Sequence, residues 1–371
     1  METIPSSSVG MKINAWYNEI QKLNVIEAER LKAEIEQDLD RMEEDQDTLL
    51  YYQMMDLRHQ LMLDYLFPNE ERMSLADYLR EIEGQGRKFS GLLEYYRSFF
   101  TGMYYFSEGK YIEAIKSYRS AEKKLTKVSD KIEKAEFYFK MAEVFYHMKQ
   151  THMSMYYISL ANEIYQKEPT YKVRQIQCHF VISGNYDDLL AHDRALPHLH
   201  KALALSQEID NWTMITKALL NMGHCYSRIG SFQAVPFYHE AIKAAKKAKA
   251  KEITSAYYDL ALIHFAKDEK TEGQECFEKA QEYAHEFQDD LCLYLLGVLE
   301  ALFLKQAGRS KVLEAFEPLK DGRGYPYLEE LALVAAEFYT KSGRLDDSVF
   351  FFKQMVDAQK QIQRGDFLYE M

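Results

Sequence analysis

The sequence predicts an all-α protein made largely of stacked helical hairpins, and the main evidence is a repeated pair of small residues. Two small residues twelve positions apart recur at intervals of roughly forty residues, a period typical of helical solenoids. The pairs are Gly102 and Ala114, Ala142 and Ser154, Ser183 and Ala195, Ala261 and Gly273, and Ala336 and Ser348. At Ala234 the pattern is incomplete, because Met222 stands where its small partner would be. No segment carries a strand pattern strong enough to add a sheet.

Small residues at these positions allow two helices to cross closely, because ridges of one helix must enter grooves of the other. The first repeat reads GMYYFSEGKYIEAIKSYRSAEKKL and resembles the tetratricopeptide repeat. The positions that carry the resemblance are Gly102, Tyr105, Gly109, Tyr111, Ala114, Tyr118 and Ala121. The long period also suits HEAT repeats, but the internal pattern argues against them. The resemblance implies about seven hairpins in a right-handed superhelix whose concave surface binds peptides or proteins.

Composition and charge narrow the class of protein. With 371 residues, 47% of them hydrophobic, and with 28 Tyr and 21 Phe, the chain can bury a large core. No stretch approaches the roughly 20 apolar residues that span a bilayer, and the first residues lack the pattern of a secretory signal. We therefore expect a cytoplasmic protein. The net charge of −12 disfavours non-specific binding to nucleic acid and favours basic peptides or basic protein surfaces.

No self-contained active site or metal site stands out in the sequence. It contains no glycine-rich phosphate loop, nucleophile elbow or zinc-protease helix. His198 and His200 are two residues apart, so on a helix they would face different sides. The cysteines lack the spacing of a disulfide framework or a paired metal site, and we expect them to be buried. They are Cys178, Cys225, Cys276 and Cys292. We expect the chain to have no metal and no cofactor of its own.

Three helical segments precede the repeats, at about residues 9–23, 26–44 and 47–65. The third reads TLLYYQMMDLRHQLMLDYL and is too apolar for a solitary helix in solvent. We therefore expect a three-helix bundle over residues 1–67, which Pro68 ends. A hinge and linker helix over 68–89 would lead to the repeat domain over 90–371. Within that domain, the repeat around 296–319 fits the pattern poorly.

An acidic segment, EEDQD, lies directly before the third helix. Asp45 or Asp47 would cap this helix, and the other acids would be favoured by the positive end of the helix dipole. This interpretation explains every residue of the segment except Gln46, which is its one neutral member.

Longer segments give a resemblance that spans essentially the whole chain. They are IPSSSVGMKINAWY, RMEEDQDTLLYYQMMDLRHQLMLDY, GLLEYYRSFFTGMYYF, DKIEKAEFYFKMAEVFYHMKQTHMSMYY and the terminal AQKQIQRGDFLYE. In this order they resemble the Rap family of bacilli, the response-regulator aspartate phosphatases of sporulation and competence control. The resemblance implies a three-helix bundle that is hinged to a tetratricopeptide-repeat domain. The two domains together would bind a phosphorylated response regulator.

The resemblance also gives Gln46 a catalytic role. In the phosphatase members, the Gln of EEDQD enters the active site of the regulator and would orient water for in-line attack on the aspartyl phosphate. A neutral amide suits this task, because it both donates and accepts hydrogen bonds and brings no negative charge against the phosphate. The regulator would supply the divalent metal, expected to be Mg²⁺.

Two binding surfaces follow from the same resemblance. The regulator-binding residues would be Glu44, Asp45, Leu49, Leu57, Leu92, Asp130 and Glu133. Leu57 stands where a related phosphatase has Phe, so the apolar character is kept. A second ligand, a signalling pentapeptide of the Phr type, would bind in the concave groove. The residues expected to bind it are Asp188 and Asn221 by matching position, with Asn185, Gln177 and Tyr257 added from helix placement.

Three functions compete. The first is a phosphatase that drains a sporulation phosphorelay, and the motifs DKIEKAEF, MKQTHMSMYY, GNYDD, RALPHL and AQKQIQRGDFLYE resemble that branch most. The second is a non-catalytic module that sequesters a DNA-binding response regulator, and the EEDQD motif does not separate it from the first. A plain scaffold of tetratricopeptide repeats is the third, but it would leave the amino-terminal bundle unexplained.

Overall fold

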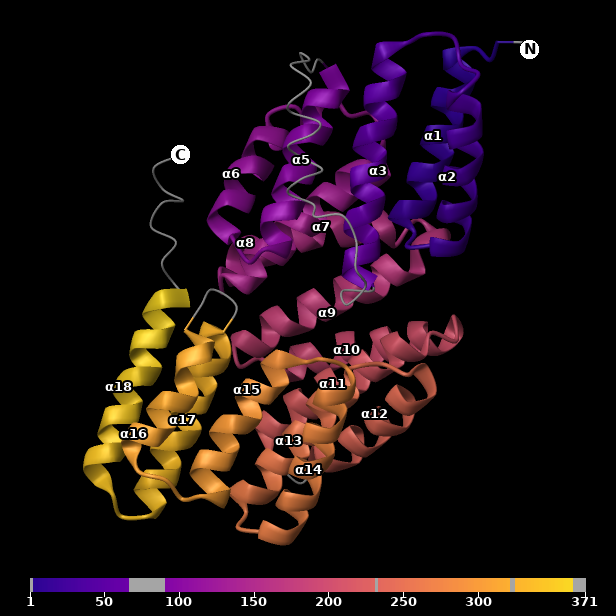
Figure 1. The fold of residues 1–371 in the computed structure, drawn as a ribbon. Helices are drawn as coiled ribbons and strands as arrows, with labels where there is room; N and C mark the ends of the chain where they lie inside the picture. Colours follow the sequence, from indigo (N-terminus) through magenta and orange to yellow (C-terminus); the bar gives the residue numbers. More distant parts are fainter. Residues whose placement is uncertain (1–2, 67–90, 231–232, 321–323, 363–371) are drawn as a thin grey trace. The chain divides into compact units, whose positions relative to one another are not determined.

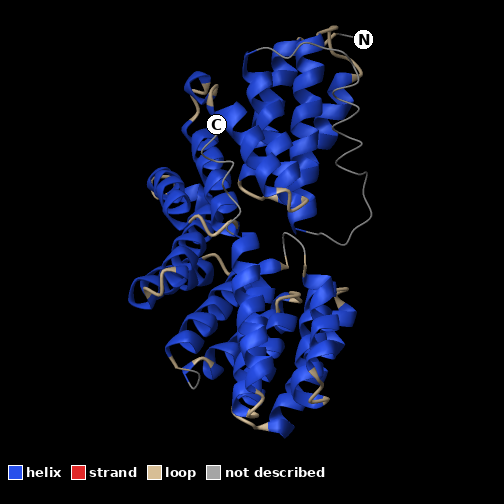
Figure 2. Ribbon diagram, turned by 90° about the vertical axis from the view of Figure 1, so that its left-hand side faces the viewer, coloured by secondary structure: helices blue, strands red, loops and turns tan. Residues whose placement is uncertain are grey.

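The computed structural model describes residues 3–66, 91–230, 233–320 and 324–362. These residues form helices joined by short turns (Figures 1 and 2). Within the described ranges, the only β pairing is an isolated parallel bridge between Ile4 and Met42. The prediction of an all-α fold is confirmed. The predicted hinge over 68–89 lies outside the described residues.

Three helices form the amino-terminal bundle: α1 (Ser6–Gln21), α2 (Val25–Leu39) and α3 (Gln46–Leu66). In α1 the buried residues Val9, Ile13, Trp16 and Ile20 recur every three or four positions, so they lie on one face of the helix. The acidic segment runs into the first turn of α3, which begins at Gln46, one residue before the predicted start.

Helical hairpins follow the bundle. The pairs are α5 (Gly91–Ser107) with α6 (Tyr111–Glu122), α7 (Lys131–His147) with α8 (Thr151–Tyr165), α9 (Lys172–Asp188) with α10 (His192–Glu208), α11 (Trp212–Ile229) with α12 (Val235–Ala248), α13 (Ile253–Ala266) with α14 (Lys270–Glu286), α15 (Asp290–Leu299) with α16 (Arg309–Phe316), and α17 (Tyr325–Lys341) with α18 (Leu345–Ile362). Over the residues that the structure describes, these seven hairpins confirm the prediction of about seven, in the predicted order.

The chain forms two compact units. The first unit comprises Met1–His147 and Met153–Cys178, and the second comprises Met148–His152 and His179–Met371. The first unit thus contains the bundle together with α5 to α7, most of α8 and the start of α9. This division differs from the predicted domain boundary, because side chains of the bundle pack on α5 and bond to α7 within one compact unit.

The small-residue pairs lie at close helix crossings, as predicted. The Ser154 hydroxyl donates to the carbonyl of Ala142 at 2.9 Å, which shows how closely α7 and α8 approach. A Cβ on Gly273 would lie 2.6 Å from the ring of Phe265. The repeat at Ala234, where Met222 stood in place of a small residue, also has a small residue at its helix crossing. This residue is Gly223, next to Met222, and a Cβ there would lie 2.6 Å from the ring of Tyr238.

Gly102→Ala should destabilise the first unit. An added Cβ would overlap the ring of Tyr118, which is fully buried. We expect a loss of about 1–3 kcal/mol in the free energy of unfolding, measured by urea denaturation. The control is Gly10→Ala in α1, where a Cβ meets nothing within 4 Å. That change should stabilise the helix by about 0.5–1 kcal/mol, and equal effects of the two substitutions would contradict the crossing.

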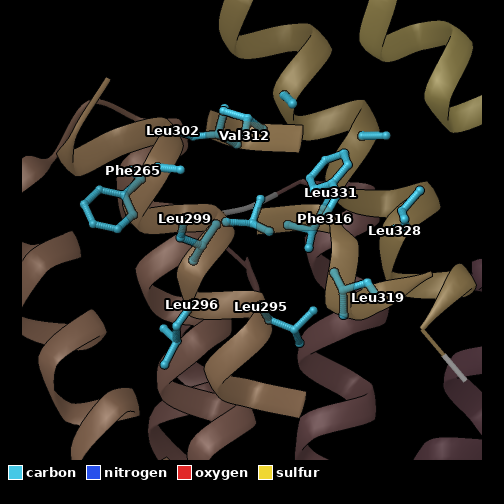
Figure 3. Packing of buried hydrophobic residues seen from close by; sticks show 14 of the residues in the cluster. Phe265, Leu295, Leu296, Leu299, Leu302, Val312, Phe316, Leu319, Leu328 and Leu331 are labelled. Carbon is cyan, nitrogen blue, oxygen red and sulfur yellow. The ribbon is translucent and has the colours of Figure 1, made fainter. Parts of the chain in front are cut away.

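The repeat that fits the sequence pattern poorly has an irregular backbone. Helix α15 continues into a π-helical turn, Glu300–Leu304, and α16 is only 8 residues long. This repeat nevertheless has a buried apolar core. Figure 3 shows Leu295, Leu299 and Phe316 pointing into one apolar cluster with Leu328 and Leu331 of the next hairpin. Across the parts of the chain that the structure describes, no helix is long and apolar enough to cross a membrane.

Candidate functional site

Gln46 is the first residue of α3, and its side chain is exposed. Asp45 caps this helix: its carboxylate accepts from the Thr48 hydroxyl and from the backbone N–H of Thr48 at 3.3 Å. These hydrogen bonds, led by that of the Thr48 hydroxyl, lower the pKa of Asp45, so the cap is charged at neutral pH. Gln46 therefore stands at the positive end of a 21-residue helix, where an anion is favoured.

The loop before Gln46 is held by the amino-terminal segment. The backbone N–H of Glu43 donates to Ile4 at 3.0 Å, and that of Ile4 donates to Arg41 at 2.9 Å. The Glu43 carboxylate in turn accepts from the backbone and the hydroxyl of Ser6, at 2.9 and 3.0 Å. These hydrogen bonds hold the loop against the start of α1, and the loop leads directly into Gln46.

Several residues predicted to bind a regulator are accessible in the first unit. Glu44 and Asp130 are exposed, Leu92 is 43% exposed, and Leu49 is half-buried. Asp130 also accepts from the backbone N–H of Ile132 at 2.8 Å, so it caps α7. Whether a regulator contacts these residues stays a prediction.

Two predicted regulator contacts are not accessible in this structure. Leu57 is fully buried, and Glu133 is 1% exposed. Leu57 lies in a stretch of α3, from Met54 to His59, whose side chains are all buried. A partner could reach either side chain only after the first unit rearranged.

Glu133 is instead the centre of a hydrogen-bond network that joins the bundle to the repeats. Its carboxylate accepts from Tyr17 at 2.5 Å and Gln21 at 2.8 Å, both on α1, and from Tyr95 on α5 at 2.8 Å. Burial raises the pKa of Glu133 to about 7, although the tyrosine hydrogen bonds and Arg58 oppose the rise. The carboxyl group therefore titrates near neutral pH while it bridges three helices.

The raised pKa of Glu133 predicts a pH dependence of stability. Between the unfolded value, about 4.5, and the folded value, about 7, the folded chain holds a proton that the unfolded chain lacks. Stability should therefore fall as pH rises through this window, and it should not recover above it. Glu133→Gln removes this titration while keeping the shape of the side chain.

We expect the Gln variant to be about 1–3 kcal/mol more stable than wild type at pH 8 and nearly equal to it at pH 4.5. Urea denaturation of both proteins at each pH measures this, and comparing the two proteins cancels the other titrating groups. A difference that did not change with pH would show that Glu133 titrates normally.

A second buried acid, Glu136, pairs with two arginines. Glu136 Oε1 accepts from Arg58 of α3 at 3.0 Å and from Arg174 of α9 at 2.7 Å, and Oε2 accepts from Tyr165 at 3.0 Å. Burial alone would raise the pKa of Glu136, but the charges of Arg174, Arg58 and Lys140 outweigh burial and lower it. The carboxylate is therefore charged, and it ties α3 to the repeats.

In the second unit, Asp188 lies at the end of α9 and Oδ1 accepts from Lys149 at 2.6 Å. Its other oxygen, Oδ2, is buried and has no hydrogen-bond partner among the described residues. A carboxylate oxygen buried without a donor is costly, so it is a candidate for pairing with a ligand.

Other acids lie near Asp188. Arg228 on α11 bonds to Asp187 at 2.9 Å and to Glu330 on α17 at 3.5 Å. Burial raises the pKa of the neighbouring Glu329, and the charges of Glu330 and Asp188 add to the rise. These contacts bring the first helices of three hairpins, α9, α11 and α17, to one acidic region of the second unit.

The remaining predicted peptide residues differ in their availability. Asn221 on α11 is half-buried, and Asn185 is fully buried. Tyr257 is half-buried and stacks on Tyr283, with ring centroids 5.8 Å apart. Gln177 belongs to the first unit, and both ends of its amide are used there, by Arg174 at 2.8 Å and Tyr65 at 3.1 Å.

Sequence reasoning missed the residues that surround Glu133 and Glu136. Tyr17 and Gln21 lie one turn apart on α1, but Tyr95 is on α5 and Arg58 is on α3, and no local spacing connects these three helices. A usable signal was present in α7: two acids three residues apart, Glu133 and Glu136, interrupt the apolar face of KIEKAEFYFK. Polar residues on such a face require partners when they are buried.

Family comparisons agree with this architecture. Residues 3–64 match the family model described as response regulator aspartate phosphatase H, N terminal, and residues 254–285 match the tetratricopeptide repeat. In Bacillus subtilis, response regulator aspartate phosphatase E is 47% identical and covers 100% of both chains. Response regulator aspartate phosphatase A is 45% identical over 100% of this chain and 99% of its own. Regulatory protein RapC is 39% identical over 99% of this chain and 98% of its own.

Solved structures are similar over nearly the whole length as well. A Rap protein complexed with competence and sporulation factor is 36% identical, with a TM-score of 0.88, covering 97% of this chain and 100% of its own. Aspartyl phosphate phosphatase F from Bacillus subtilis is 35% identical, with a TM-score of 0.70. The match covers 98% of this chain and 97% of its own.

Proposed function

Because this chain belongs to the Rap family of response regulator aspartate phosphatases, we propose that it hydrolyses the phosphoaspartate of a sporulation phosphorelay regulator, with Gln46 as the catalytic group. The observation that carries this proposal is the placement of Gln46. It is an exposed neutral amide at the amino-terminal end of a long helix, directly after a loop that Ile4 and Ser6 hold in place.

Gln46 would act by positioning water. An acyl phosphate is already activated, so the main requirement is to hold a water in line with the bond that breaks. The amide oxygen would accept from this water, and the amide nitrogen would donate to a phosphoryl oxygen. The divalent metal, Mg²⁺, would be supplied by the regulator. The part of this chain would be to orient the water and the phosphoryl group.

The regulator would dock on the exposed and half-buried residues around Gln46. Glu44, Asp45 and Leu49 come from the bundle, and Leu92 and Asp130 come from the start of the repeats. Contact with Glu133 would require its hydrogen bonds to α1 and α5 to break, and contact with Leu57 would require this buried side chain to become exposed. The hydrogen bonds of Glu133 would then oppose regulator binding, because they stabilise the arrangement in which this carboxylate is hidden.

A signalling pentapeptide of the Phr type would inhibit the protein by binding to the second unit. The support is the acidic region around Asp188, whose Oδ2 has no donor among the described residues, together with Asn221 on α11. A basic side chain of the peptide would pair with Asp188, and the Asn221 amide would bond to the extended peptide backbone.

Release of phosphate from a purified phosphorylated regulator tests the proposal, with this protein at one-tenth of the regulator concentration. We expect multiple turnovers. The alternative function is sequestration of a DNA-binding response regulator without catalysis, and the likeness to regulatory protein RapC favours testing it. Tight binding with no turnover would establish that alternative, because a sequestering protein cannot consume an excess of phosphorylated regulator.

A further inference from the structure

Three side chains able to bind a metal meet in the second unit, where α9, α10 and α11 come together. Asp187 lies near the end of α9, His192 begins α10, and Cys225 lies on α11. One ligand atom from each lies within 4.8 Å of the other two. Asp187 Oδ1 and His192 Nδ1 are 2.9 Å apart.

We propose that Asp187, His192 and Cys225 form a Zn²⁺ site. Carboxylate, imidazole and thiolate are the usual zinc ligands, with bonds of about 2.0–2.3 Å. Tetrahedral geometry then places the ligand atoms about 3.3–3.7 Å apart, a range that lies between the observed 2.9 Å of the Asp187–His192 pair and the 4.8 Å limit of the group. Three protein ligands leave the fourth position for water. Cys225 binds as the thiolate and releases its proton to solvent.

Burial and charge favour this site. Cys225 is 1% exposed, and the side chains of Asp187 and His192 are 19% and 16% exposed, so solvent has limited access to a bound ion. Arg228 donates to Asp187 Oδ2 at 2.9 Å and leaves Oδ1 for the metal. The positive charges of Zn²⁺ and Arg228 are then balanced by Asp187, the Cys225 thiolate and Glu330, which contacts Arg228.

The sequence alone predicts no metal site, because these residues do not form a motif. Asp187 and His192 are separated by a turn between two helices, and Cys225 is more than thirty residues further along the chain. The turn itself brings the first two together: Leu190 adopts a left-handed conformation, φ +56°, and reverses the chain between α9 and α10. The packing of α11 against α10 then brings Cys225 to the pair.

The position of the site gives the ion a role, and this step rests on the proposed function. Asp187 precedes Asp188, and Cys225 follows Asn221 by one helical turn, so these two of the predicted peptide residues adjoin metal ligands. A bound ion would tie the α9–α10 turn to α11 and hold Asp188 and Asn221 in a fixed relation. Zinc would therefore order the peptide site before the peptide arrives.

Metal titration of the full-length, reduced, metal-free protein tests the site. Zn²⁺ is titrated in competition with a chromogenic chelator, and Co²⁺ is used as a spectroscopic probe. We expect one equivalent of Zn²⁺ to bind, and Co²⁺ to give a thiolate charge-transfer absorption. Cys225→Ser should abolish that absorption and weaken zinc binding by about 100-fold or more. Cys292→Ser, a buried cysteine on α15 of the same unit, is the control and should change neither.

Asp187→Asn provides a second test that keeps the shape of the site, and circular dichroism confirms that each variant is folded. It should weaken zinc binding while leaving the absorption of the remaining thiolate complex. No Co²⁺ absorption in wild type, or equal zinc affinity in wild type and Cys225→Ser, would overturn the proposal. Because the titration uses neither regulator nor peptide, its failure would leave the proposed phosphatase function standing.

Discussion

Gln46→Ala should lower the turnover of phosphorylated regulator by about 100- to 1000-fold and leave regulator binding nearly unchanged. The side chain is exposed, and no fold-stabilising contact of the bundle depends on it, so its loss removes only the orientation of water and phosphate. Effects of this size are typical when one preorganised polar group is removed from a transition state. The measurement is phosphate release under steady-state conditions, with binding to the phosphorylated regulator followed separately.

Two further variants separate chemistry from structure at this position. Gln46→Glu keeps the side-chain length and favours the helix amino terminus, so the protein should be at least as stable as wild type. It should nevertheless be inactive, because a carboxylate repels the phosphoryl group and cannot donate to it. Gln37→Ala, an exposed glutamine on α2, should retain full activity. Wild-type turnover by Gln46→Ala would exclude the proposed role, and loss of regulator binding would assign Gln46 to docking.

The helices and their turns could be predicted from the sequence because local patterns determine them. The small-residue pairs identified the hairpins, and the acidic segment identified the start of α3, where Asp45 is the cap. One crossing was misread by one residue: Gly223 lies directly after Met222, and only the structure shows which side chain meets Tyr238.

The buried polar network could not be predicted in the same way, because it depends on contacts between distant segments. Glu133 and Tyr17 are 116 residues apart, and Arg58 and Glu136 are 78 apart. The resemblance placed Glu133 on a binding surface, whereas the structure buries it between α1, α5 and α7. Gln46 is the opposite case: composition gave it no role, and the structure leaves it exposed at the start of α3, where its catalytic role stays a prediction.

Glu136→Ala should destabilise the first unit by about 3–5 kcal/mol. Glu136 is fully buried, and its carboxylate is the acceptor that both Arg58 and Arg174 share. Removing one partner of a buried ion pair is strongly destabilising, because the remaining charge stays buried without compensation, and here two arginines are left. Tyr165 also loses the acceptor of its hydroxyl. Urea denaturation, followed by the far-ultraviolet signal of the helices, measures the loss.

The matched control is Glu163→Ala on the neighbouring helix α8. Glu163 also pairs with a cation, Lys167 at 3.0 Å, but both side chains are about 70% exposed. Exposed pairs contribute less than about 1 kcal/mol, so this variant should be close to wild type. If Glu136→Ala does not fold, Glu136→Gln keeps one acceptor oxygen for the two arginines, removes the charge, and places an amide N–H donor where the second oxygen accepted from Tyr165. It should fold with an intermediate loss of stability, because the two arginines would keep a polar partner but no counter-charge. Equal effects at positions 136 and 163 would show that the buried cluster does not hold α3 to the repeats.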